Sequence, residues 1–148
     1  MQKPTPTLDG LPAGMRKAVE EVMRADEPLV GVWTTRGFGA NALVCTSWRA
    51  LVAKRAELVR WSVGSFPYGE IDSVEVWQGR PGSAVQVEIV QPQPDNPPKP
   101  GIFDDFPDAY YQESRRIVAP NTIMFRSRRR AREAVESLQG LIVERGSA

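Results

Sequence analysis

Histidine is absent from the sequence. Because histidine is the commonest general base near neutral pH and a usual zinc ligand, its absence argues against acid–base catalysis and against a zinc site. No phosphate-loop or Gly-x-Gly-x-x-Gly pattern occurs either, and Gly37 and Gly39 form only a lone pair of turn glycines. We therefore expect a non-catalytic protein with no catalytic residue, no metal and no cofactor.

The sequence is also poor in cysteine and in long apolar runs. Its single cysteine, Cys45, excludes an internal disulfide and lies in a predicted strand, which favours a small buried side chain over a nucleophile. No apolar run approaches the roughly 20 residues that cross a bilayer, and the amino terminus lacks the pattern of a secretory signal. These absences predict a cytoplasmic protein.

The net charge is close to zero, with 19 basic and 18 acidic residues. A charge this small argues against nucleic acid as an obligatory partner, and any binding to a membrane surface would need a local basic patch. The 148 residues, 41% of them hydrophobic, can bury one core. We expect a disordered leader at 1–10 and a single domain at 11–148.

Alternating apolar and polar residues between Phe38 and Trp77 predict a run of antiparallel strands. Turn-forming residues separate these runs at Gly37, Thr46-Ser47, Gly64 and Gly69. Strands are expected at 29–35, 40–45 and 48–54, around Trp61, at 71–77 and 85–89, and from Asn121 through Phe125.

Apolar residues at helical spacing predict one helix at each end of the chain. The first runs from Leu11 to near Asp26, where Pro28 prevents its continuation. The second begins after Ser127, a suitable N-cap. Its apolar stripe comprises Ala131, Ala134, Val135, Leu138, Leu141 and Ile142.

Residues 91–118 contain six of the 13 prolines, too many for a strand inside a sheet. We interpret them as an insertion with an extended first half and an acidic, aromatic second half. Asp104, Asp105 and Asp108 could crowd together or bind a hard cation, but without EF-hand spacing they are better explained as solvated acids.

Two segments resemble bacterial pleckstrin-homology-like proteins. Residues 42–51, with Thr46 and Arg49, resemble the strand, Thr-turn, Arg and strand signature of that family, and residues 65–74 are similar to its aromatic, acidic and Ile-x-Ser-Val segment. The resemblance covers residues 27–90 and 121–142. It implies a mainly β (α+β) fold: a barrel of about seven antiparallel strands in two sheets, capped by a C-terminal helix, here with an additional N-terminal helix.

The same resemblance implies symmetric homo-oligomers, as some family members form. Trp77 and Phe38 are apolar candidates for such an interface. Eukaryotic members of the fold commonly hold phosphoinositide headgroups with basic residues near the first hairpin loop. That loop has only Arg36 here, so the lipid pattern is not carried over.

An arginine cluster at the start of the last helix is the one unusual charge feature. Exposed cations there oppose the helix dipole by roughly 0.3–1 kcal/mol each. They form either a solvated face, partly neutralised by Glu133, Glu136 or the acids of the insertion, or a site for an anionic ligand. The candidate site residues are Arg126, Arg128, Arg129 and Arg132, with Arg130 on the far side of the helix.

The sequence therefore predicts a binding or scaffolding module that acts through protein contacts and self-association. The alternative is a peripheral binder of a lipid headgroup or another phosphate, using the arginine cluster.

Overall fold

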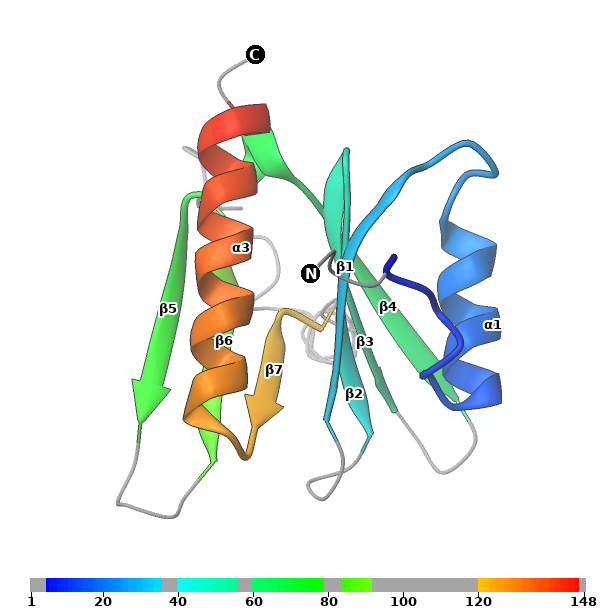
Figure 1. Ribbon diagram of the computed structural model, residues 1–148, viewed down its shortest axis with the longest axis horizontal. Helices are drawn as coiled ribbons and strands as arrows, with labels where there is room; N and C mark the ends of the chain where they lie inside the picture. The colour runs from blue at the N-terminus through cyan, green and yellow to red at the C-terminus, as the bar shows by residue number, and fades with distance from the viewer. Residues whose placement is uncertain (1–4, 36–39, 56–59, 79–83, 92–119, 147–148) are drawn as a thin grey trace, which may run out of the picture.

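The computed structural model describes residues 5–35, 40–55, 60–78, 84–91 and 120–146. Seven strands form two antiparallel sheets, in the orders β1-β2-β3-β4 and β5-β6-β7 (Figure 1). The elements are α1 (Ala13–Val22), β1 (Leu29–Thr35), β2 (Asn41–Thr46), β3 (Arg49–Arg55), β4 (Trp61–Pro67), η1 (Tyr68–Glu70), β5 (Ser73–Gln78), β6 (Val85–Val90), β7 (Thr122–Phe125) and α3 (Arg128–Gly146). The predicted mainly β fold with a helix at each end is confirmed.

The Thr46 hydroxyl group makes three hydrogen bonds within the turn between β2 and β3. Thr46 Oγ1 accepts the backbone N–H groups of Trp48 and Arg49, each at 3.1 Å, and donates to the Arg49 carbonyl, also at 3.1 Å. Two further hydrogen bonds come from outside the turn, because the Ser47 N–H group donates to the Pro28 carbonyl at 2.9 Å and the Tyr68 hydroxyl donates to the Thr46 carbonyl. The predicted turn at Thr46-Ser47 is confirmed.

The four-stranded sheet is covered on both faces, and every residue of β2 is buried. Leu43 and Cys45 belong to the cluster shared with the second sheet and α3, whereas Ala42 and Val44 belong to the cluster shared with α1. This alternation follows from the two-residue period of a strand. In Figure 1, α1 lies on the side of this sheet that faces away from α3.

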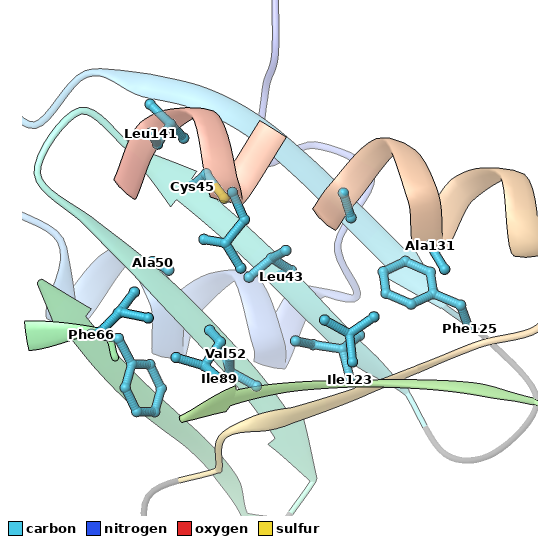
Figure 2. Packing of buried hydrophobic residues seen from close by; sticks show 14 of the residues in the cluster. Leu43, Cys45, Ala50, Val52, Phe66, Ile89, Ile123, Phe125, Ala131 and Leu141 are labelled. Atoms are coloured by element: carbon cyan, nitrogen blue, oxygen red, sulfur yellow. The ribbon is translucent and has the colours of Figure 1, made fainter. Parts of the chain in front are cut away.

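The larger core lies between the two sheets and α3. Leu43 and Val52 of the first sheet meet Ile89 and Ile123 of the second, and Ala131 is among the residues that α3 adds (Figure 2). Each of these five residues is no more than 2% exposed. Burial of a full aliphatic side chain stabilises by about 1.5–3 kcal/mol, so α3 is an integral part of this core.

The N-terminal helix is shorter than the predicted span of 11–26, because α1 ends at Val22. Met23 is extended, with ψ at 143°, and the Val22 carbonyl accepts the Arg49 Nη2–H group at 2.8 Å. The side chain of Arg49, on β3, thus donates to one of the last carbonyl groups of the helix, and the chain turns towards β1. Met15 and Val19 are fully buried against the sheet.

The predicted break at Gly64 is wrong, since β4 runs through this residue without interruption. A glycine is needed here because Pro120 and the Phe66 ring approach the strand closely, and not because the chain turns. A Cβ atom at Gly64 would lie 2.3 Å from the Pro120 carbonyl oxygen and 2.8 Å from the Phe66 ring. The predicted strand at 71–77 also begins later, because a 3-10 turn at Tyr68–Glu70 precedes β5.

Several predictions concern residues outside the described ranges. They include Phe38, the loop glycines Gly37 and Gly39, and nearly all of the insertion at 91–118 with its three aspartates. The division into a leader at 1–10 and a domain at 11–148 stays a prediction. Within the described ranges, no helix has the length and apolar character required to cross a membrane.

Candidate functional site

The two edges of the three-stranded sheet differ in how they are covered. At the β7 edge, the Met124 N–H group donates to Asn41 Oδ1 of β2 at 3.0 Å, and the Lys54 ammonium group of β3 donates to the Thr122 hydroxyl. At the outer edge of β5, no strand of the described chain pairs with the backbone. Among the described residues, the β5 edge is therefore the one without a pairing partner.

β5 also exposes large apolar side chains. Val76 is 44% exposed and Trp77 is 57% exposed. Because neighbours along a strand point to opposite faces, Val76 faces α3 while Trp77 lies on the outer face of the sheet. An open strand edge with exposed apolar residues is a template for pairing with another chain.

A cleft of about 170 Å³ lies between β5 and the first turns of α3. It is lined by Val76, Gln78, Val85, Arg128, Ala131, Arg132, Val135 and Glu136. Its apolar lining comes from three elements, because Val76 lies on β5, Val85 on β6 and two residues on α3. The helical residues are spaced by three or four positions and therefore share one face of the helix. The result is an apolar hollow with charged residues around it.

The arginines predicted as an anion site are divided around the start of α3. Arg128 and Arg132 line the cleft beside β5. Arg129 does not line the cleft and pairs with Glu133 at 3.3 Å, on an exposed part of the helix. Arg126 lines a different hollow. A single site built from all four residues stays a prediction.

The second hollow, of about 180 Å³, is lined by Thr35, Phe125, Arg126, Ser127 and Arg130. Arg130 Nη1 donates to the Thr34 carbonyl at 2.8 Å, and the Arg130 N–H group donates to Ser127 Oγ at 3.3 Å. Ser127 is thus confirmed as the N-cap of α3. The polar groups of this hollow are largely engaged in holding β1 and the helix start together.

The two arginines of the cleft, Arg128 and Arg132, differ from Arg130 in their contacts. Neither Arg128 nor Arg132 makes a side-chain hydrogen bond or ion pair with another described residue. Both are exposed, and both lie in the first turns of a helix, where the dipole disfavours cations. Within the described ranges, no acceptor is therefore bound to either guanidinium group.

The strongest ion pair of the described chain was not predicted. Glu27 and Arg49 form a bidentate pair, with 2.7 Å from Nη2 to Oε1 and 3.0 Å from Nε to Oε2. Arg49 also donates to Ser65 Oγ at 3.0 Å. The Glu27 side chain is fully buried. The hydrogen bond from Arg49 lowers the pKa of Glu27 from 4.5 to about 2, against the opposing effect of burial.

This pair is structural, because four of the five N–H donors of Arg49 and both carboxylate oxygens of Glu27 are engaged within the fold. It joins the segment after α1 to β3 and β4, and it lies away from the cleft, whose lining includes neither residue. Arg49 belongs to the Thr-turn motif, so the sequence could single it out. Glu27 carried no comparable signal, since its partner is 22 positions away.

Cys45 behaves as predicted, as a small buried side chain. Burial raises the pKa of its thiol to about 12, so the nucleophilic thiolate is not formed near neutral pH. The neighbouring Tyr68 hydroxyl donates to the Thr46 carbonyl at 2.6 Å. The described ranges also contain no cluster of three residues able to hold a metal ion.

Two solved structures are similar to this chain. One is a DUF1696 family protein with a pleckstrin-homology domain from Shewanella loihica PV-4, with 13% identity, coverage of 88% of each chain and a TM-score of 0.47. The other is a pleckstrin-homology domain from Shewanella amazonensis SB2B, with 17% identity, coverage of 60% of this chain and 74% of that chain, and a TM-score of 0.42. No protein-family model and no curated protein matches the chain. At these TM-scores the fold assignment rests on the chain's own topology: sheets of four and three antiparallel strands closed by a C-terminal helix make it pleckstrin-homology-like.

Proposed function

We propose that residues 11–148 form a non-catalytic binding module that takes an extended segment of a partner protein onto the β5 edge. The observation that carries this proposal is the edge of β5, which no described strand pairs, beside an apolar cleft. A segment added to a sheet edge gains main-chain hydrogen bonds along its length, while a neighbouring pocket selects its side chains. β5 supports both, since the cleft adjoins its Val76 and Gln78.

The charge of the cleft argues for an occupant that carries an acidic group. Arg128 and Arg132 line the cleft, and neither pairs with another described residue. A segment of a partner protein with a carboxylate side chain would complement this charge.

A random peptide library tests this proposal with the full chain as bait. Peptides that bind should lose at least about tenfold in affinity when Val76→Asp places a charge in the cleft. Val30→Asp is the matched control, because Val30 is 40% exposed on β1, which is at an edge of the other sheet. Failure to select any peptide, or equal loss in both variants, would contradict the proposal.

An anionic small ligand is the second candidate, because Arg128 and Arg132 have no described partner. A phosphate group held by these cations should bind with an affinity that falls steeply with salt. Titration with polyphosphate and with vesicles containing anionic lipid, at two ionic strengths, measures this. Binding to vesicles but not to polyphosphate would identify a membrane surface as the source of the phosphate.

A further inference from the structure

The two ends of the cleft beside β5 are lined by different residues. Gln78 of β5 pairs with Val85, and Val85 pairs with Phe125, which lies just before α3 begins. At its other end α3 reaches η1, before the start of β5, so the helix and the strand run in opposite directions (Figure 1). Arg128 therefore lies at the Gln78 end of the cleft, and Glu136 lies two turns further towards the Val76 end.

A strand added to β5 would place alternate side chains over this cleft. Residues opposite Gln78 and Val76 point to the α3 face, and they are two positions apart in the added strand. The first position adjoins the arginines. The second lies over Val76 and Val135, which are the apolar residues of that end of the cleft.

Resting on the proposed function, we propose that the bound segment carries an acidic residue followed two positions later by an apolar residue. The acidic side chain binds between Arg128 and Arg132, and the apolar side chain packs on Val76 and Val135. The order acidic-x-apolar follows from antiparallel pairing, which is the arrangement of the whole sheet and the slightly more stable one.

Two features of the charges set this order. A guanidinium group presents donors that match a carboxylate, and neither arginine is occupied by another described residue. Glu136 lies further along the cleft and repels an acid from the apolar position. A segment of reversed order would place its carboxylate near Glu136 and its apolar side chain beside two cations.

Three designed nine-residue peptides test this inference on the full chain. They share threonine-rich flanks and differ only at the centre, which reads Glu-Thr-Val, Gln-Thr-Val or Val-Thr-Glu. We expect the first to bind about tenfold more tightly than the other two, as for a charge-assisted contact in a partly desolvated site. Fluorescence anisotropy gives the affinities, and amide hydrogen exchange shows whether β5 becomes protected.

Helix variants locate the acidic contact. Arg128→Gln and Arg132→Gln should each remove most of the preference for Glu over Gln. Arg129→Gln is the control, because Arg129 is engaged with Glu133 and does not line the cleft. It should leave the preference unchanged.

The outcomes separate this inference from the function on which it rests. Protection of β5 with equal affinity for the Glu and Gln peptides overturns the acidic position but leaves strand addition standing. Equal binding of the reversed peptide overturns the order. If no peptide protects β5 at any concentration used, strand addition at this edge fails, and the inference fails with it.

Discussion

Arg49 and the pair Arg128 and Arg132 differ in what the fold does with their charge. Arg49 is mostly buried and donates to a carboxylate, a hydroxyl group and a backbone carbonyl. The two arginines of the cleft are exposed and donate to no other described residue. The difference teaches that the number of arginines in a segment says little about a binding site, whereas the partners of each guanidinium group say a great deal.

The same comparison explains why the carboxyl group with the most perturbed pKa among the described residues is not a site for chemistry. Perturbed pKa values often mark functional groups, but ion pairs inside the fold perturb them as well. The pKa of Glu27 is lowered by Arg49, to which the carboxylate is already bound. Glu27 does not line the cleft. We therefore expect the Glu27–Arg49 pair to govern stability and the cleft arginines to govern binding.

The largest effect should come from breaking the buried pair. Glu27→Ala leaves Arg49 without its carboxylate partner and should lower the free energy of unfolding by about 3–5 kcal/mol. Urea denaturation at pH 7 measures this. Glu133→Ala is the control, because its pair with Arg129 is exposed and should contribute less than about 1 kcal/mol. Equal losses in the two variants would remove the distinction between the two kinds of arginine.

Acid should reproduce part of this loss in the unmodified chain. The pKa of Glu27 is about 2 in the folded state and near its ordinary value of 4.5 when unfolded. Its stabilisation is therefore complete above pH 4.5 and is lost as the pH falls towards 2, by about 3 kcal/mol in total.

Urea denaturation at several pH values between 5 and 2 measures this contribution. In Glu27→Gln, which cannot titrate, the free energy of unfolding should depend less steeply on pH in that window. The difference in slope should correspond to about one proton fewer taken up on unfolding. A slope that is the same in both proteins would show that other carboxylates account for the acid sensitivity.

A smaller effect should follow from Arg49→Lys, which keeps the charge but loses the planar set of donors. A lysine can satisfy one carboxylate oxygen, but it cannot also reach Ser65 and the Val22 carbonyl in the same arrangement. We expect a loss of about 1–3 kcal/mol, between that of Glu27→Ala and the parent. A neutral result at pH 7 would show that charge alone sustains the pair.

Much of the fold was predictable because its signals are local. The alternation along β2 and the Thr46 turn each depend on adjacent residues, and both were predicted correctly. Gly64 was not, because the reason for a glycine there is the close approach of Pro120, which is 56 positions later in the chain. Sequence distance likewise concealed the partner of Arg49.

The candidate site was predictable only in part. The arginine cluster was visible as a run of charge, but of the four residues predicted as one site only Arg128 and Arg132 line the cleft. Which strand they face depends on the direction of α3 across the second sheet. That direction is set by tertiary packing, so the cleft beside β5 had no signal in the sequence.

The smallest effect should be a gain in stability from changing a cleft arginine. Arg128→Gln removes an exposed cation from the first turn of α3, where the helix dipole disfavours it, and should raise the free energy of unfolding by roughly 0.3–1 kcal/mol at low salt. Arg145→Gln is the matched control, because Arg145 lies in the last turn and its charge is favourable there. The control should therefore lose stability by a similar amount, and both effects should shrink as salt is added. A loss of stability in Arg128→Gln would mean that this arginine has a partner in the fold. Arg128 would then be a structural residue, as Arg49 is.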